Sequence, residues 1–405
     1  MVITETDSQA WRLETPGHQG WQRSPRPGDP NKYFMVTVDS HVSEPADLWV
    51  KRIDKKYRHR LPRIEVDEHG EKWQVAEGYR PNKIRDLKLE GDDLERGLRG
   101  TGGFATDQEL EWDIQRRLED HARDGIDAET IYPNKGLAMW ATPDPVFSMA
   151  MCRVYNEWVW EIFAPHNDRM APMAALASGD IDGAIAEIQR VAQLGFRGLT
   201  LPSKPVWGGH DPDELNYNDH AFDRLWAAVE EAGLPITFHV STGRDPRASH
   251  GPGGAIINMA VHSFIPTTEP LVQLCASGIL ERHPGIRFAT IEAGIGWLPW
   301  LLKTMDEGAR MHHMYAYPKL QALPSEYFKR QGFASFQEDE PGIDLARKYD
   351  LIDNIIWAND YPHQEGLWPH SAQSIERTMG VLTDDERAKI LGGNAARLFG
   401  FKGKL

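Results

Sequence analysis

The sequence of 405 residues lacks the features that several protein classes require. Its only two cysteines, Cys152 and Cys275, are far apart, so we expect neither a disulfide framework nor a thiolate metal site. Acidic residues outnumber basic ones, 60 to 45, and the formal net charge of -15 disfavours nucleic acid and anionic lipid surfaces as partners. No apolar run reaches the roughly 18 residues that a membrane span needs, and the N-terminus has no signal-peptide pattern. We therefore expect a soluble, cytoplasmic protein that acts on a small molecule.

The chain divides into an arm and one large domain. Residues 14–32 concentrate Pro, Gly and polar side chains, so residues 1–33 are expected to form an irregular arm. Hydrophobic residues make up 40% of the sequence, which suffices for a real core in the part that follows. We expect a single domain over residues 34–405.

Within that domain, short β-prone runs alternate with longer helical patterns, which is typical of βα units around a parallel sheet. Helices are predicted over residues 181–194, with Gly195 as a stop, and over 219–232. A last helix is predicted to open at Thr383, because Glu386 three residues on completes a capping box. Together with eight strands, these patterns predict an α/β fold of the (β/α)8 TIM-barrel type. The strands are expected at residues 34–38, 128–131, 171–176, 197–201, 235–238, 286–291, 333–336 and 355–358.

The interval between the first two strands, about residues 42–127, is far longer than an ordinary βα connection. It is rich in charge and glycine, and we interpret it as an insertion. Because βα connections emerge at the end of a barrel where active sites lie, the insertion is predicted to act as a lid or specificity element.

Ligand-type side chains follow three of the predicted strands. Asp39 and His41 are two residues apart, so they can face one ion from the end of the first strand. His239 ends the fifth strand and Asp360 follows the eighth. Each residue alone has a structural interpretation, as a helix cap or a core histidine, but their shared position favours a metal site. Carboxylate and imidazole ligands together suit a divalent Zn, Mn or Fe ion, and one or two ions are possible.

Several longer motifs are spread along the domain. They are VDSHVSEPADLW at 38–49, YPNKGL at 132–137, RVYNEW at 153–158, LPITFH at 234–239, SGILERHPGIRFATIEAGIGWLPWLL at 277–302, NDYPHQEGLWPHS at 359–371 and GGNAARLFG at 392–400. Together they resemble the amidohydrolase superfamily, in particular the amidohydrolase-2 branch related to aminocarboxymuconate semialdehyde decarboxylase. The resemblance implies a barrel that binds a divalent metal through Asp39, His41, His239 and Asp360, with Asp360 also acting as general base or proton shuttle. It also implies a catalytic role for His239 as the ligand that orients the electrophile.

Two positions depart from the superfamily pattern. Asp39 stands where many members carry a histidine, and this harder ligand shifts preference from Zn toward Mn or Fe. Glu292 follows the sixth strand where a histidine is usual. Glu292 is either an acid-base group, a ligand of a second metal or a cap for the helix that follows. A second metal site would combine Glu292 with Glu44 and His262, although such histidines are more often structural.

Four further residues are candidates for contacting the substrate. Lys135 and Arg244 follow the second and fifth strands and can anchor an anionic substrate through charge-assisted hydrogen bonds, although solvated surface charge is their simpler interpretation. Trp297 can line an aromatic pocket, or belong to the core. His363, close after Asp360, can reach the mouth of the barrel.

The leading hypothesis is a metal-dependent decarboxylase or hydrolase that cleaves a C-C or C-N bond in a small carboxylated, cyclic or aromatic substrate. Two alternatives remain open on the same fold: a binuclear Fe or Mn oxygenase, and a catalytically silent partner subunit. The intact ligand residues argue against the silent subunit. We also expect an oligomer, built from copies of this chain or with a related subunit.

Overall fold

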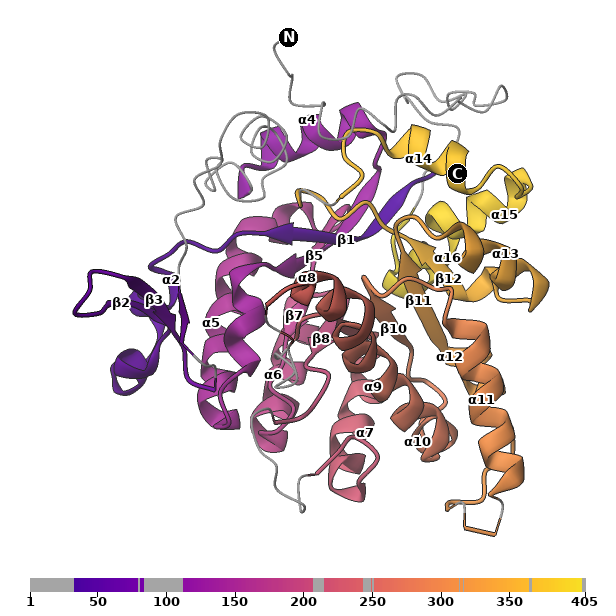
Figure 1. Cartoon of the computed structure of the whole chain (residues 1–405), viewed down its shortest axis with the longest axis horizontal. Helices are drawn as coiled ribbons and strands as arrows, with labels where there is room; N and C mark the ends of the chain where they lie inside the picture. Colours follow the sequence, from indigo (N-terminus) through magenta and orange to yellow (C-terminus); the bar gives the residue numbers. More distant parts are fainter. Residues whose placement is uncertain are drawn as a thin grey trace.

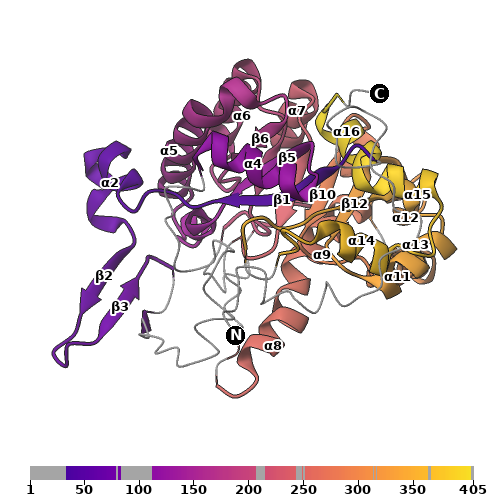
Figure 2. The same ribbon diagram turned by 90° about the horizontal axis from the view of Figure 1, so that it is seen from above.

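The computed structural model describes residues 33–78, 81–83, 112–206, 215–242, 249, 251–312, 314–315, 317–363 and 366–402. The predicted arm, except for Tyr33, and much of the predicted insertion lie outside these residues. The described part forms a TIM barrel, in which parallel strands alternate with helices that surround them, as Figures 1 and 2 show. This confirms the predicted α/β architecture.

All eight predicted strand regions form β structure, in chain order around the barrel. The third region divides at Met173 into two short strands, and the ladders between neighbouring barrel strands are all parallel. The strands are β1 Val36–Val42, β5 Ala128–Pro133, β6 Met170–Pro172, β7 Ala174–Ala175, β8 Leu199–Leu201, β9 Ile236–His239, β10 Phe288–Ile291, β11 Gly332–Phe336 and β12 Ile355–Trp357.

The strand hydrogen bonds do not form one continuous closed ladder. One sheet has the order β1-β5-β6 and the other runs from β12 through β11, β10, β9 and β8 to β7. They adjoin at Met173, whose N–H donates to the Ile131 carbonyl while the next residue pairs with the other sheet. No ladder joins β1 to β12 among the described residues; instead an isolated parallel bridge links Ser40 to Tyr361, in the segment just after β12. Backbone hydrogen bonds run there from the His41 N–H to the Tyr361 carbonyl and from the Asp360 N–H to the Asp39 carbonyl. The first and last strands therefore meet at a weakly bonded seam.

The predicted helices form where their signals place them. Gly195 ends the first predicted helix with φ 102°, a left-handed conformation that glycine adopts without strain. Asp219 caps a short 3-10 turn that leads into the second, and the Thr383–Glu386 capping box opens the third. The helices around the barrel are α5 Pro145–Phe163, α6 Ile181–Leu194, α7 Asp223–Ala232, α9 Phe264–Ala276, α10 Ile279–Arg282, α11 Leu298–Met311, α12 Pro324–Gln331, α13 Glu340–Lys348, α14 Ser371–Thr378, α15 Asp384–Ala388 and α16 Asn394–Phe399.

The described parts of the insertion contain regular structure of their own. Strands β2 Arg63–Val66, β3 Lys72–Val75 and β4 Asn82–Lys83 form a small antiparallel sheet, which extends away from the barrel in Figure 2. The short helix α2 Leu48–Arg52 precedes them. The insertion ends in helix α4 Ile114–Asp124, which packs against β1 and β5 and begins at the Asp113 cap.

None of the described helices is long and apolar enough to cross a membrane. Cys152 in α5 and Cys275 in α9 are both buried and carry no disulfide.

Candidate metal centre

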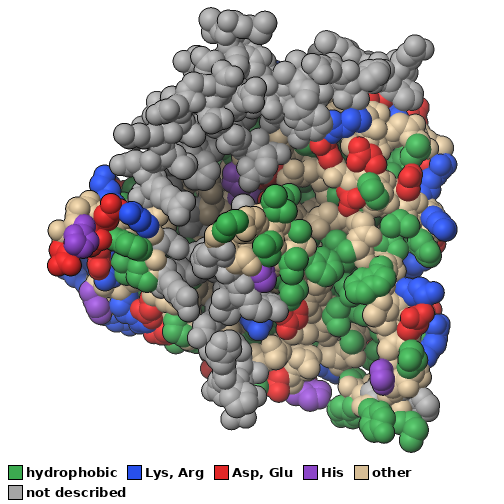
Figure 3. Space-filling view, viewed as in Figure 1, with side chains coloured by type: hydrophobic (Ala, Val, Ile, Leu, Met, Phe, Trp, Pro, Cys, Tyr) green, Lys and Arg blue, Asp and Glu red, His purple; other side chains and the backbone are tan. Residues whose placement is uncertain are grey.

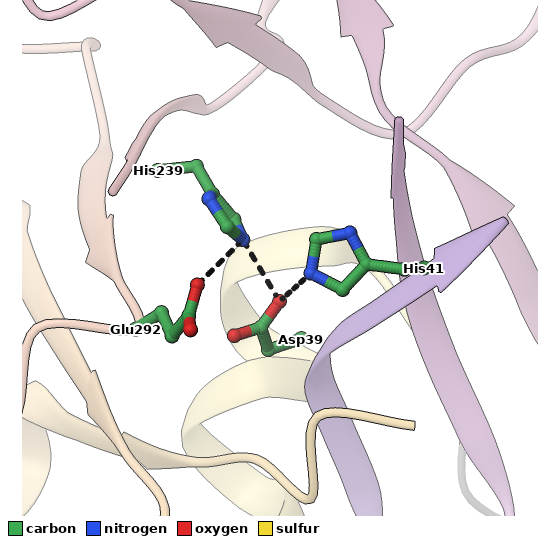
Figure 4. Close-up of side chains that lie close together, drawn as sticks. All are labelled: Asp39, His41, His239 and Glu292. Atoms are coloured by element: carbon green, nitrogen blue, oxygen red, sulfur yellow. Dashed lines mark hydrogen bonds and ion pairs between the residues drawn. The ribbon is translucent and has the colours of Figure 1, made fainter. Parts of the chain in front are cut away.

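Four ligand-type side chains converge at the carboxyl end of the barrel strands. Asp39 and His41 come from β1, His239 is the last residue of β9, and Glu292 directly follows β10. Their ligand atoms all lie within 4.8 Å of one another, and Figure 4 shows the side chains pointing toward a common centre. His239 Nε2 lies 3.1 Å from Asp39 Oδ1 and 3.4 Å from Glu292 Oε2, and His41 Nε2 lies 3.3 Å from the same Asp39 oxygen.

Asp360 and His363 extend this cluster on the side of β12. Asp360 Oδ1 lies 3.5 Å from His41 Nε2 and 2.8 Å from His363 Nδ1. The ring of His363 stacks on that of His41, with centroids 4.0 Å apart. His41 therefore belongs to both groups that can hold a cation, and the four predicted ligands come together with Glu292 and His363.

The backbone at these positions is specialised. The sequence predicts that the first strand ends before Asp39, but β1 runs on through His41, and its pairing with β5 shifts register between Thr37 and Ser40. Such a bulge re-aims side chains near functional sites. Glu292 and Asp360 have φ angles of 61° and 56°, a conformation that costs a non-glycine residue on the order of 1–3 kcal/mol and often marks functional sites.

Hydrogen bonds to the backbone set the orientation of both imidazoles. His41 Nδ1 lies 3.1 Å from the Pro133 carbonyl, and His239 Nδ1 lies 2.6 Å from the Val240 carbonyl. When Nδ1 donates to a carbonyl, the other ring nitrogen, Nε2, is left facing the cluster with a lone pair for a metal.

The cluster contains buried polar atoms that a cation would satisfy. Among the described residues, Asp39 Oδ2 and His41 Nε2 have no hydrogen-bond partner, although both side chains are fully buried. Buried polar groups are nearly always paired, so this deficit in a set of carboxylates and imidazoles fits a divalent cation.

The protonation states reflect burial and close contact. Burial would raise the pKa of the Asp39 carboxyl, but His239 and His41 outweigh it and hold that pKa well below its usual range. Burial and the nearby His363 lower the pKa of His41 to about 3. Burial would lower the pKa of His239, but the charge and hydrogen bond of Asp39, together with Glu292 and the Val240 carbonyl, raise that pKa to about 9. Burial and the nearby Asp360 raise the pKa of Glu292 well above its usual value, which favours the protonated form of this carboxyl.

Two residues considered for a second metal lie outside the cluster. Glu44 is buried, but its Oε1 accepts a hydrogen bond from the Gly136 N–H, 3.1 Å away. His262 lies at the end of the π-helical turn Asn258–His262, where its Nε2 contacts Ser249 Oγ at 3.2 Å. Of the three residues, the structure brings only Glu292 to the other ligands.

The four residues predicted to contact the substrate do not all lie at the ligand cluster. Trp297 packs its ring against Phe264 at the start of α11, and its indole N–H donates to the Ala293 carbonyl. Lys135 begins the 3-10 turn after β5, but its side chain is outside the described residues, as is the whole of Arg244. Only His363 is placed within the cluster.

Tyr132 is a site residue that the sequence analysis did not single out. It lies near the end of β5, fully buried, with its ring centroid 5.0 Å from that of His239 and 6.3 Å from that of His41. Its position at a strand end, like those of the ligands, is the signal that could have identified it.

Comparisons with known proteins place this geometry in context. The chain is 27% identical over 272 residues to the gamma-resorcylate decarboxylase of Rhodococcus jostii, covering 65% of this chain and 80% of that protein. An amidohydrolase from Mycobacterium avium subsp. paratuberculosis shares its fold with a TM-score of 0.69 and 21% identity, covering 91% of this chain and 98% of that one. A dihydroxybenzoic acid decarboxylase from Polaromonas, solved with manganese and 2-nitroresorcinol, has a TM-score of 0.61 at 19% identity, over 91% of this chain and 97% of that one.

The family assignment rests on the match along the domain. The sequence model of the amidohydrolase family, Amidohydro_2, covers residues 38–401, from the first metal-ligand strand to the last helix. This chain therefore belongs to the amidohydrolase family, as its motifs indicate.

Proposed function

We propose that this protein is a divalent-metal-dependent decarboxylase of a small aromatic carboxylic acid. The observation that carries the proposal is the convergence of Asp39, His41, His239, Glu292 and Asp360. Among the described residues, the buried atoms Asp39 Oδ2 and His41 Nε2 in this cluster have no hydrogen-bond partner. The resemblance to gamma-resorcylate decarboxylase supports decarboxylation rather than hydrolysis or oxygenation.

Manganese is the cation that the comparisons favour, because a decarboxylase of the same fold was solved with it. Asp39, His41, His239 and Asp360 would hold the ion, and Glu292 is close enough to join them. When bound, such a cation polarises substrate oxygens and offsets negative charge that develops during the reaction.

The chain's own residues supply the proton that decarboxylation needs. The ring carbon gains a proton, the C–C electron pair returns to the ring, and carbon dioxide leaves. We assign delivery of the proton to Asp360, whose carboxylate contacts both His41 and His363. The His363 side chain is 17% exposed, so it links the buried Asp360 to solvent.

Glu292 has a different role in this proposal. Its side chain is 22% exposed, and its raised pKa favours the protonated form, which can donate a hydrogen bond toward a carboxylate in the barrel mouth. The positive φ of Glu292 holds its side chain toward His239, and its N–H donates to Ser335 Oγ.

The test is carbon dioxide release by the metal-stripped protein after addition of Mn²⁺, with 2,6-dihydroxybenzoate and 5-carboxyvanillate as probe substrates. We expect stoichiometric carbon dioxide and the decarboxylated phenol from at least one probe, and no oxygen uptake. Oxygen consumption with two bound ions would support the oxygenase instead. Failure to bind Mn²⁺ at all would contradict the proposal.

Oligomer formation remains a prediction, with one supporting observation. On the face drawn in Figure 3, hydrophobic side chains gather over the segment of α8 Gly254–Ile257 and the turn after it. Ile256 and Met259 there are 74% and 80% exposed. Contiguous apolar surface of this kind often marks a protein contact.

A further inference from the structure

Helix α4 buries a face made of charged and polar side chains. Arg117, Asp120, His121 and Asp124 are spaced three and four residues apart, so they share one side of the helix, and all four are buried. Charged side chains are almost never buried without partners. The hydrogen-bond partners of this face therefore show which segments the helix positions.

Arg117 holds the strand that carries two of the metal ligands. Its Nη1 donates to the His41 carbonyl at 2.9 Å, and its Nη2 donates to Ser40 Oγ at 3.0 Å. The guanidinium also pairs with Glu129 of β5 through two hydrogen bonds of 2.6 and 2.7 Å, and Ser40 Oγ donates to the same carboxylate at 2.6 Å. This planar pairing fixes the guanidinium, and with it the backbone between Asp39 and His41.

The other half of the face holds the segment around Asp360. Tyr361 donates its hydroxyl hydrogen to Asp120 Oδ2 at 2.7 Å, and Asn359 Nδ2 donates to Asp124 Oδ2 at 3.1 Å. These two residues flank Asp360 directly. Asp124 also accepts hydrogen bonds from the backbone and hydroxyl of Ser371, which fixes the end of the same loop.

The helix bridges the place where strand pairing is weakest. β9 and β10 share four paired residues in register, whereas β1 is joined to the segment after β12 by an isolated bridge from Ser40 to Tyr361, with backbone hydrogen bonds to the Tyr361 and Asp39 carbonyls. Metal ligands lie on both sides of this seam, and α4 contacts both sides from outside the barrel. Figures 1 and 2 both show α4 beside β1 and β5.

We infer that α4 is a clamp that sets the spacing between the ligands Asp39 and His41 and the ligand Asp360, with Arg117 as its main positioning residue. The inference rests on the proposed metal site. Partners in a metal's outer shell typically change metal affinity 10–100-fold when they are removed. The clamp would thus couple the insertion to the metal centre without touching the ion.

The test compares Mn²⁺ affinity in Arg117→Lys and Arg387→Lys, measured by electron paramagnetic resonance of free Mn²⁺, with thermal melts of the metal-free proteins. Arg387 is a matched control because it forms an equally buried pair with Glu376, away from the ligand strands. Lysine keeps the charge of arginine but loses the bidentate pairing. We expect Arg117→Lys to weaken Mn²⁺ binding at least tenfold, and Arg387→Lys to change Tm only, with affinity within twofold of wild type.

A milder variant keeps the test decisive if Arg117→Lys does not fold. Tyr361→Phe removes only the hydroxyl that binds Asp120, and we expect Mn²⁺ binding to weaken severalfold. If Arg117→Lys and Tyr361→Phe fold with a lower Tm but bind Mn²⁺ with wild-type affinity, α4 has a purely structural role. That result would overturn the inference. Absence of Mn²⁺ binding in the wild-type protein would instead contradict the proposed function.

Discussion

Two buried polar clusters lie on opposite sides of β1, and they differ in how completely their atoms are paired. Inside the barrel, Asp39 and His41 leave ligand atoms without a hydrogen-bond partner among the described residues. Outside it, Arg117 and Glu129 are joined by two hydrogen bonds, and Asp124 accepts three. The outer cluster is not completely paired either, because among the described residues neither ring nitrogen of His121 has a hydrogen-bond partner, although Nε2 lies 2.9 Å from Glu129 Oε2. The unpaired carboxylate and imidazole atoms of the inner cluster fit a cation, whereas the two-bond pair of Arg117 and Glu129 fits a positioning role.

The two clusters also differ in backbone conformation. Glu292 and Asp360 adopt left-handed φ angles at the inner site, whereas the outer cluster lies on the regular helix α4 and the strand β5. The strain at the inner site is tolerated because hydrogen bonds around it fix the loops. The comparison therefore predicts that inner substitutions affect activity directly, whereas outer substitutions lower stability and, through the positions of the proposed ligands, metal affinity.

The largest effect is expected for Asp360→Asn. Removing the proton carrier should lower kcat for decarboxylation by about 10³–10⁴-fold, equivalent to about 4–5 kcal/mol. Thermal melts should show little loss of stability, because the change removes one of several crowded carboxylates. Carbon dioxide release and calorimetry measure the two quantities, and an active Asp360→Asn variant would contradict the assignment.

In the outer cluster, Glu129→Leu should reduce stability by about 4 kcal/mol, because it leaves the buried Arg117 charge without its partner. Chemical denaturation of the metal-free protein measures this loss. Lys51→Ala, which breaks an exposed pair with Asp47, is the control and should change stability by less than about 0.5 kcal/mol. Equal effects of the two variants would remove the distinction between buried and exposed pairs here.

Asp124 gives the outer cluster a pH dependence. Burial raises the pKa of this carboxyl to about 6, from 3.8 when unfolded. Between about pH 4 and pH 6 the unfolded chain ionises while the folded protein keeps the proton, so the free energy of unfolding falls as pH rises. The loss is about 3 kcal/mol, complete above the folded pKa. Between pH 4 and pH 7 the free energy of unfolding should fall by about 2–3 kcal/mol more in wild type than in Asp124→Asn, measured by denaturation, whereas parallel profiles would refute the assignment.

The smallest expected effect is stabilisation by metal. Mn²⁺ at about one hundred times its Kd should stabilise the folded protein by about 2.7 kcal/mol, because it binds the native state alone. Calorimetry with Mn²⁺ or a chelator measures the shift in Tm. The shift should vanish in a His41→Ala, His239→Ala double variant, and its persistence there would place the metal elsewhere.

Much of the barrel could be predicted from local sequence patterns. Eight β-prone runs separated by amphipathic segments predict its strands, and the glycine stop at Gly195 and the capping box at Thr383 predict helix ends. The convergence of the proposed ligands was predictable too, because the carboxyl ends of barrel strands meet at one face. The extension of β1 through His41 was not, because a bulge depends on pairing with β5.

Other features depended on contacts that sequence spacing does not contain. Glu44 and His262 carry side chains that can bind a second metal. In the structure, however, they form contacts with Gly136 and Ser249, outside the ligand cluster. Tyr132 joins the site only because β5 lies beside β1.

By itself, the sequence determined the alternation of strands and helices and the residues that can bind a cation, because periodicity and strand-end position are local properties. Only the tertiary structure decided that helix α4 buries a charged face. Its sequence, IQRRLEDHARD, is polar enough to suggest a solvated helix, yet one face is buried against β1 and the loop after β12. Burial of those charges depends on hydrogen-bond partners such as Glu129, Tyr361 and Asn359. These partners are distant in sequence, and only folding of the chain brings them within hydrogen-bonding distance.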